Sequence, residues 1–432
     1  MKRILKYILA AHLAAVSVSM AQNPAVGKAS SKAIVISGAE IHVGNGTVIP
    51  NGTIVIEKGL IKEVGASVSN IPADAVKIDA KGKRVYPGII SPNSTLGLNE
   101  IASVRATTDF SEIGSINPNI RSLIAYNTDS EVIPTVRGNG VLISQATPEG
   151  GLISGRSSIM NHDGWNWEDA VLKADDGVWL SWPARVTASF DFATMSRENK
   201  KNPNYANVIR ELDGFFTQAE AYKAEAGTTA NIKLEAMQAV LKGNARLYIQ
   251  VEKGKEIIDA IRFCKSHKIK YPVIVGAVSS TLAIDAIKEN NIPVLLPTTH
   301  RLPDNGDDEV WEAYKLPAKL FAKGILTGMY YNESYWRTRN LPFVAGSAAA
   351  HGLSKGDALK MITENNAKIL GIDNVVGTLE KGKQATLFIS AGDILDMMTA
   401  KVEKAFIKGA EISLDDKQKR LYKKYADKYG IE

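Results

Sequence analysis

The chain has 432 residues, with 52 lysines and arginines against 46 aspartates and glutamates, and a formal net charge of +6. Hydrophobic residues make up 45% and charged residues 23%, which is ordinary for a folded protein and excludes a disordered, collagenous or coiled-coil chain. A single domain of about 100–200 residues is too small for this length, whereas a barrel of about 250 residues with an appended domain fits it.

The N-terminal segment is typical of a secretion signal. It begins with three basic residues among the first six, continues as an apolar run and reaches small residues just before Gln22. This pattern predicts cleavage after Ala21 and an exported, periplasmic protein without a membrane span. The alternative is a membrane anchor, which the shortness of the run and His12 within it disfavour. Cleavage removes three basic residues from a net charge of +6 and leaves +3, so charge indicates neither a nucleic-acid nor a membrane partner.

The two ends of the mature chain carry the pattern of short β-strands. Apolar residues alternate along residues 33–65, and glycine and asparagine separate the runs, as in β-hairpins with one solvated face. The same pattern returns at residues 377–414. We therefore expect one small β-sandwich built from residues 33–86 and 377–414.

The middle of the chain alternates between two patterns. Strand-like runs such as GVLISQA, ARLYIQV and PVIVGAV are separated by helix-like runs such as EIIDAIRFCKSH. This alternation predicts βα units around a buried parallel sheet, that is, an α/β fold with a (β/α)₈ TIM barrel over residues 87–376. The polar residues 195–235 are interpreted as a helical excursion or lid. Residues 415–432 are rich in lysine and predict a solvated amphipathic helix at the C-terminus.

The single cysteine, Cys264, excludes an intrachain disulfide. The segment IIDAIRFCKSHKI has helical spacing that places Ile257, Ile261 and Cys264 on one side. Cys264 is therefore expected to be buried and unreactive.

Three stretches together resemble the amidohydrolase superfamily, and in particular its imidazolonepropionase-like and dipeptidase-like branch. They are GKRVYPGIISPNSTLG, ARLYIQVEKGKEIIDAIRFCKSHKIKYPVIVGAVSS and AAAHGLSKGDALKMITENNAKILGIDNVVGTLEKGKQATLFIS. The similarity covers roughly residues 33–410. It implies a barrel whose mouth holds zinc or another divalent metal and hydrolyses carbon–nitrogen bonds. In that family, strand 1 supplies His-x-His, strands 5 and 6 one histidine each and strand 8 an aspartate, and the metal activates a bound water molecule.

In this sequence the corresponding positions carry other residues, and in chain order they are Asn93, Thr95, Gln250, Gly276 and Asn332. A second alignment of the last strand puts Ala348 in place of Asn332, and in either case no carboxylate remains, although Glu333 is adjacent. Neutral amides, a hydroxyl and a glycine are poor zinc ligands. The resemblance therefore predicts a pseudoenzyme, with no metal or other cofactor expected.

The histidines do not replace the missing set. His42 falls in the predicted sandwich, and His267 and His351 are interpreted as solvated or capping residues. His162 and His300 are expected near strand ends, with His300 on the mouth side after strand 7, but no second histidine or cysteine is spaced to pair with it. A nucleophile elbow and a phosphate-binding loop are also absent from the sequence.

Aromatic residues and arginines gather in segments expected near the mouth. One interpretation is packing of long loops or a contact between subunits. The other is a retained pocket with aromatic walls and arginines for a carboxylate, suited to peptides or amino-acid derivatives. The residues proposed for such binding are Trp165, Trp182, His300, Tyr331, Trp336 and Arg337.

Three hypotheses for function follow. The protein is a non-catalytic paralogue that binds a related, intact amidohydrolase; it is a binding protein for a small peptide or amino-acid-like ligand; or it is an active carbon–nitrogen hydrolase with an unconventional site that uses His300 and Glu333.

Overall fold

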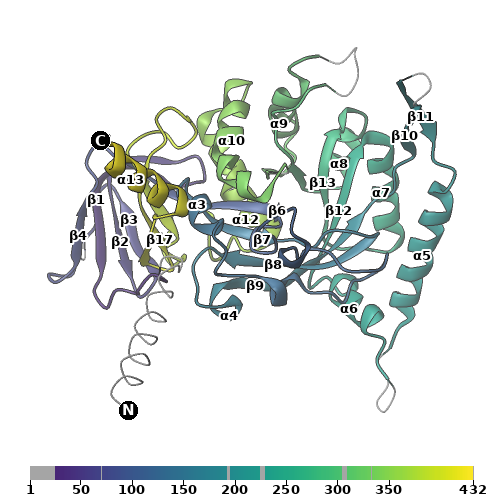
Figure 1. Ribbon diagram of the computed structural model, residues 1–432, viewed down its shortest axis with the longest axis horizontal. Coiled ribbons are helices and arrows are strands. Elements are labelled where there is room, and N and C mark those ends of the chain that lie inside the picture. The colour runs from purple at the N-terminus through teal and green to yellow at the C-terminus, as the bar shows by residue number, and fades with distance from the viewer. Residues whose placement is uncertain are drawn as a thin grey trace, which may run out of the picture.

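The computed structural model describes residues 25–69, 71–191, 195–223, 229–303, 309–331 and 333–431. Two eight-stranded sheets lie side by side, and the large helices gather around the second one (Figure 1). The predicted signal segment, residues 1–21, lies outside the described residues. Within the described part of the chain, no helix is both long and apolar enough to cross a bilayer.

The first sheet joins the two ends of the chain. Its order is β18-β17-β16-β5-β1-β2-β3, with β4 paired to β1. The junction between the N-terminal and C-terminal strands is the antiparallel pair β5–β16, in which Tyr86 lies opposite Phe388. The two end segments thus combine, as the sequence pattern indicates. The strands are β1(Ile34–His42), β2(Val48–Glu57), β3(Leu60–Gly65), β4(Val76–Asp79), β5(Arg84–Pro87), β16(Leu387–Ser390), β17(Val402–Ile407) and β18(Ala410–Ile412).

The second sheet is a nearly closed barrel with the order β15-β14-β13-β12-β9-β8-β7-β6. The prediction of a wholly parallel barrel is wrong for one strand, because β8 runs antiparallel to both of its neighbours, β7 and β9. Only residues 147–152 join β7 to β8, which is too short for a crossover helix and suits a hairpin. The strands are β6(Ile89–Ser94), β7(Val141–Ala146), β8(Ile153–Asn161), β9(Val171–Ser181), β12(Arg246–Lys253), β13(Pro272–Ser279), β14(Val294–Leu296) and β15(Thr327–Met329).

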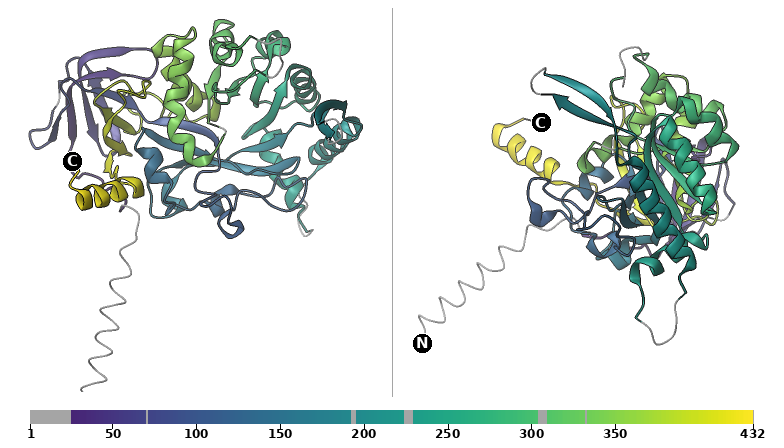
Figure 2. Two further views of the ribbon diagram at one scale, coloured as in Figure 1. Left: turned by 45° about the horizontal axis from the view of Figure 1, so that its top comes forward. Right: turned by 90° about the vertical axis from the view of Figure 1, so that its right-hand side faces the viewer.

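Helices cover the outside of the barrel, and α5 and α7 stand at the edge far from the first sheet (Figures 1 and 2). The predicted helical excursion, residues 195–235, is only partly helical, since it opens with β11(Ser196–Lys201), which pairs with the preceding strand β10(Val186–Asp191). The helices are α2(Ser122–Ala125), α3(Ile133–Arg137), α4(Trp167–Ala170), α5(Tyr205–Ala221), α6(Ile232–Leu241), α7(Gly254–Ser266), α8(Ile284–Glu289), α9(Glu312–Ala322), α10(Leu341–Ala350), α11(Lys355–Ile362), α12(Glu364–Leu370) and α13(Lys417–Tyr429), with 3₁₀ turns η2(Arg105–Thr107), η3(Thr281–Ala283) and η4(Tyr335–Asn340).

Helix α7 shows how the barrel wall is packed. Ile257, Ile261 and Cys264 are buried on one side of the helix, as their spacing predicts, and they join one hydrophobic cluster with Leu247 and Ile249 of β12. Burial raises the pKa of the Cys264 thiol to about 12. Cys264 is therefore part of the core, and its thiol stays protonated at neutral pH.

A side chain spans the one open seam of the barrel. Among the described strands, no pairing joins β15 to β6. The side-chain amide of Asn366 in α12 donates to the carbonyl of Ile90 in β6 at 2.8 Å and to that of Met329 in β15 at 2.9 Å. Any side chain at Gly328 would overlap the Asn366 carboxamide, so a glycine is needed there.

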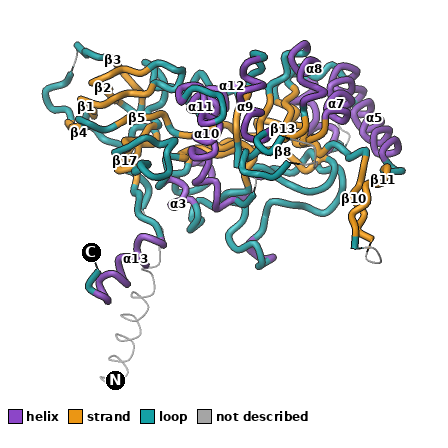
Figure 3. The backbone as a smooth tube through the Cα atoms, turned by 90° about the horizontal axis from the view of Figure 1, so that it is seen from above, coloured by secondary structure: helices purple, strands orange, loops and turns teal. Residues whose placement is uncertain are grey.

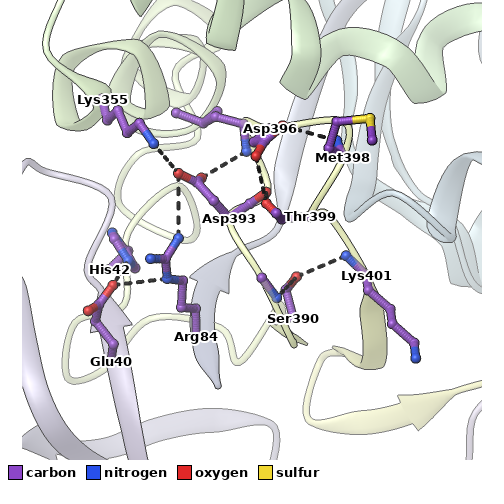
Figure 4. A network of polar contacts seen from close by, with 12 residues as sticks. Glu40, His42, Arg84, Lys355, Ser390, Asp393, Asp396, Met398, Thr399 and Lys401 are labelled. Carbon is purple, nitrogen blue, oxygen red and sulfur yellow. Dashed lines mark hydrogen bonds and ion pairs between the residues drawn. The ribbon is translucent and has the colours of Figure 1, made fainter. Parts of the chain in front are cut away.

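Ion pairs join the first sheet to the barrel (Figure 4). Arg84 of β5 contacts Glu40 of β1 at 3.2 Å and Asp393 at 3.4 Å. Lys355, the first residue of α11, donates to Asp393 at 2.6 Å. Asp393 thus pairs with one cation from the first sheet and one from helix α11. Burial alone would raise the pKa of Asp393, but the hydrogen bonds from Lys355 and from the Leu395 backbone, with the charges of Lys355 and Arg84, lower it.

Candidate functional site: the barrel mouth

The carboxyl ends of β6, β7, β9 and β12–β15 lie at one end of the barrel, which we call the mouth. A pocket of about 400 Å³ opens there. The structure brings two of the predicted ligand positions, Gln250 and Gly276, together in its wall. The other polar or aromatic residues in the wall are Trp182, Glu252, Lys253, Glu256 and Tyr330.

Gln250 lies near the carboxyl end of β12, two residues beyond the buried Tyr248, which belongs to the cluster inside the barrel. Side chains two residues apart along a strand share a face, so Gln250 also points inward. Its side-chain oxygen accepts a hydrogen bond from Ser181 Oγ at 3.0 Å. The Gln250 side chain, at the predicted histidine position, is thus held by a polar neighbour on β9.

Gly276 differs from the expected ligand position in backbone as well as in residue type. Its φ is 105°, and the following Ala277 has a φ of 53°. A Cβ atom at Gly276 would lie 3.0 Å from the carbonyl oxygen of Val251. The left-handed conformation makes any L side chain here strained, so a histidine could not be restored without movement of β13.

Asn93, on the first strand, also has left-handed backbone, with a φ of 48°. Its N–H donates to Gln145 Oε1 at 3.2 Å, and its side chain forms a hydrogen bond with the Tyr330 hydroxyl. Burial raises the pKa of Tyr330, so this hydroxyl stays protonated. Thr95 follows directly after β6 and is half-buried. Asn93 therefore links strands at the mouth instead of standing free as a ligand.

The sequence allowed two residues, Asn332 and Ala348, at the last predicted ligand position. Asn332 lies outside the described residues, although it follows β15, which ends at Met329. The alternative, Ala348, is wrong, because it is buried in α10 and is not at a strand end. Strand 8 of the sequence interpretation is thus β15.

Three charged residues at the mouth were missed by the sequence analysis. Glu252 and Lys253 end β12, and Glu256 follows in the first turn of α7. The Glu256 carboxylate accepts the backbone N–H of Arg185 at 2.9 Å. The two-residue spacing of Gln250 and Glu252 could have shown that both side chains lie on the same face of β12. The family motif, however, includes only the histidine position.

The six proposed binding residues are divided among separate places. Only Trp182 lines the mouth pocket; its Nε1 donates to Tyr205 Oη at 3.2 Å, and its ring meets Phe263 edge-on at 5.5 Å. His300 and Tyr331 line a second pocket of about 610 Å³ beside α10. There His300 Nε2 lies 2.7 Å from Ser347 Oγ. Burial lowers the pKa of His300 although the Glu333 charge opposes this, so the ring favours its neutral form.

Trp336 and Arg337 do not form the expected carboxylate clamp. The guanidinium of Arg337 lies 4.8 Å from the centre of the Trp336 ring and pairs with Glu333. The guanidinium of Arg337 is therefore already paired within its own segment, and neither Trp336 nor Arg337 lines the mouth pocket.

Trp165 lies at the end of the barrel away from the mouth, so its predicted placement near the mouth is wrong, whereas His162 lies next to a strand end, as predicted. Both follow β8, whose antiparallel direction carries its carboxyl end away from the mouth. The ring of His162 is buried and lies 2.9 Å from both the Val141 carbonyl and Ser144 Oγ. Burial lowers the pKa of His162 to about 3, so it is a neutral residue of the core. The Trp165 side chain is 71% exposed.

The other histidines have structural partners. His42 stacks on Tyr86 at 4.6 Å in the first sheet. His351 ends α10. His267 is the C-cap residue of α7, so the second of its two expected roles, capping, is confirmed; it is buried and not solvated, and its ring contacts Asp213 and Glu220.

The donor set at the mouth does not fit the metal of the family. Within the described residues, no group of three or more histidine, cysteine, aspartate or glutamate side chains could hold an ion. What the mouth offers is one carboxamide, two carboxylates, one ammonium and two aromatic rings. Such a set can bind a small polar molecule through hydrogen bonds and charge.

Comparison with known proteins agrees with this architecture. Residues 337–412 match the model of the amidohydrolase family. A segment of 115 residues is 28% identical to the amidohydrolase tasK of Hapsidospora irregularis and covers 26% of this chain but only 12% of that relative.

Among solved structures, an amidohydrolase from Thermotoga maritima MSB8 superposes with a TM-score of 0.75 at 22% identity, over 88% of this chain and 99% of that one. A prolidase complexed with N-methylphosphonate-L-proline gives a TM-score of 0.55 at 14% identity, over 88% and 100% of the two chains. A Xaa-Pro dipeptidase with bound methionine gives 0.53 at 13% identity, over the same shares.

A nearly closed eight-stranded barrel with a pocket at its mouth, beside a sheet built from both chain ends, defines a protein of the amidohydrolase fold. The comparisons thus show an amidohydrolase-family segment at residues 337–412 and an amidohydrolase-like fold over most of the chain.

Proposed function

We propose that this protein is an exported, non-catalytic member of the superfamily that binds a small amino-acid-like ligand at the barrel mouth. The single observation that supports the proposal is that Asn93, Gln250 and a left-handed Gly276 stand at the positions where the resemblance predicts histidines. A divalent metal needs several basic or anionic donors around one point, and these residues do not supply them. No step of the family's metal-dependent hydrolysis is therefore assigned to this chain.

The chemistry of the mouth pocket selects the class of ligand. Glu252 and Glu256 suit an amine, Lys253 suits a carboxylate, and Trp182 provides a flat apolar wall. A molecule with an amine and a carboxylate on a short body, such as an amino acid or a dipeptide, complements all three. The prolidase and dipeptidase mentioned above, which were solved with a proline phosphonate and methionine, support this choice by analogy.

We also propose a domain division, a cellular location and a protein partner. Residues 33–86 and 377–414 form a unit separate from the barrel of residues 87–376, and their sheet closes on itself as a small sandwich around the cluster that includes Ile36, Ile54 and Leu387. The protein acts in the periplasm after loss of residues 1–21. A related, intact amidohydrolase is a further partner.

The decisive experiment combines metal content with ligand binding. We expect elemental mass spectrometry of the purified mature chain to find no stoichiometric zinc, and thermal-shift screening with dipeptides and N-acyl amino acids to find a stabilising ligand. Trp182→Ala should abolish the thermal shift. Trp165→Ala, the same change at the end of the barrel away from the mouth, should leave the shift intact. Stoichiometric zinc with amide turnover, or flat melting curves across the panel, would contradict the proposal.

A second candidate, an active carbon–nitrogen hydrolase with an unconventional site, is favoured by one observation. Ser347 Oγ lies 2.7 Å from His300 Nε2 in the pocket beside α10, and a neutral imidazole can accept a hydroxyl proton. The hydroxyl also contacts the Phe343 carbonyl at 3.1 Å, which offers its proton a purely structural acceptor. Turnover of amide substrates after exhaustive chelation, lost in both Ser347→Ala and His300→Ala, would establish this function. No turnover across a broad panel would exclude it.

A further inference from the structure

Among the described helices of ten or more residues, the C-terminal helix α13 is the one without a buried residue. None of its residues is buried. It stands out from the first sheet (Figure 3), and its N-terminal part is tied back by an ion pair between Arg420 and Glu131 at 3.5 Å. The sequence predicted a solvated helix here, and its exposure bears this out. The exposure of its apolar side chains needs a separate explanation.

Helix α13 is amphipathic, and its apolar side faces solvent. Leu421, Tyr425 and Tyr429 follow each other at intervals of four residues, and Tyr422 lies beside them on an arc of about 100°. Their exposed fractions are 44% for Leu421, 50% for Tyr425, 64% for Tyr429 and 65% for Tyr422. A soluble helix normally turns such a face toward the core, so this one is available to a partner outside the chain.

The other side of α13 is strongly basic. Six cations and a single acid, Asp427, lie between residues 417 and 429. The cations flank the apolar arc on both sides; they are Lys417, Lys419, Arg420, Lys423, Lys424 and Lys428. Long basic side chains beside a tyrosine-rich face are the arrangement by which helices lie in the headgroup region of a bilayer.

We propose that α13 binds the surface of an anionic phospholipid bilayer, with its tyrosine face at the headgroup level and its basic residues paired with lipid phosphates. Charge decides between this partner and a second copy of the chain. Two α13 helices brought face to face would place six cations of each copy against six of the other, whereas an anionic surface neutralises them. The helix would lie in the plane of the surface and hold the barrel close to it.

Vesicle co-sedimentation of the chain beginning at residue 22 tests the proposal. We expect binding to vesicles that contain phosphatidylglycerol and little binding to pure phosphatidylcholine. Each basic residue near an anionic surface contributes about fivefold to affinity, so Lys423→Gln with Lys424→Gln should weaken binding about 25-fold. Tyr422→Ser, Tyr425→Ser and Tyr429→Ser together should weaken it at least about tenfold.

Matched controls separate this surface from general charge and exposure. Lys233→Gln with Lys265→Gln makes the same change of charge on α6 and α7, and Trp165→Ser removes another exposed aromatic ring; all should bind as the parent protein does. Because α13 has no buried residues, its variants should melt as the parent does. Equal sedimentation of the parent and the α13 variants, or equal binding to both kinds of vesicle, would overturn the proposal. So would a dimer, seen by light scattering, that the tyrosine variant abolishes without any vesicle binding.

Discussion

Tyr248 donates its hydroxyl to Asp176 at 2.6 Å inside the barrel. The same carboxylate accepts from Ser157 Oγ at 2.7 Å and from Gln145 Nε2 at 2.9 Å. Gln145 in turn accepts the Asn93 N–H, so the network runs from the barrel interior to the mouth. Burial raises the pKa of Asp176 although the hydrogen bonds from Tyr248 and Ser157 lower it.

The raised pKa of Asp176 predicts a pH-dependent cost. The folded state holds the Asp176 proton more tightly than the unfolded chain does, where the pKa is about 3.9. Protonated Asp176 therefore contributes fully to the free energy of unfolding below the pKa of the unfolded chain. This contribution is lost as pH rises through the pKa of the folded state. We expect Asp176→Asn to gain stability relative to the parent protein as pH rises above about 4. Urea unfolding of both proteins at a series of pH values measures this, and a difference that does not change with pH would refute it.

The backbone of Gly276 predicts opposite effects of the same substitution at two glycines. Gly276→Ala should lower the free energy of unfolding by about 1–3 kcal/mol, because alanine is strained at this φ and meets the Val251 carbonyl. Gly214 lies in α5 with open space around its Cα, so Gly214→Ala should raise stability by about 0.5–1 kcal/mol. Chemical denaturation checks both. Equal effects of the two substitutions would show that Gly276 is not constrained.

The ion pairs of Asp393 predict a second pH dependence, with the opposite sign. The pKa of Asp393 is lowered in the folded state. Ionised Asp393 therefore contributes to the free energy of unfolding above the pKa of the unfolded chain, and this contribution is lost as pH falls through the pKa of the folded state. Asp393→Asn should reduce stability by about 1–3 kcal/mol at neutral pH, and the two proteins should converge in strong acid. Glu403→Gln, which breaks the exposed pair with Lys83 at 2.6 Å, should change little. A deficit of Asp393→Asn that persists in acid would be evidence against the ion pairs as its cause.

The burial of Cys264 predicts an unreactive thiol. Because burial raises its pKa to about 12, thiolate is scarce at neutral pH, and the sulfur is also shielded. We expect a thiol reagent to label the folded protein far more slowly than the protein in denaturant. Rapid labelling of the folded protein, followed by mass spectrometry of the α7 peptide, would contradict the packing of this helix.

The sequence was sufficient to predict the overall architecture where a local pattern and a motif agree. The alternation of apolar residues found the terminal strands, and the motif placed Gln250 and Gly276 at the mouth, where both line one pocket. Cys264 was predicted to be buried from helical spacing alone, because α7 has a well-defined apolar side.

The direction of a strand was not predictable from its residues. The run that forms β8 has the same alternation in either direction, and only the short connection to β7 makes it antiparallel. Trp165 was assigned to the mouth for this reason. The left-handed backbone of Asn93 and Gly276 was equally hidden, since it depends on hydrogen bonds and close approaches from neighbouring strands. Nor did spacing reveal that His300 meets Ser347 across 47 residues.

The carboxamide of Asn366 has a consequence for how the barrel can deform. Two strands joined by a ladder of backbone bonds must break several of them together to separate, whereas β15 and β6 share a single side-chain amide. Separation of the barrel at this junction would break only the two hydrogen bonds of Asn366, whereas separation at any other junction would break a ladder of backbone hydrogen bonds.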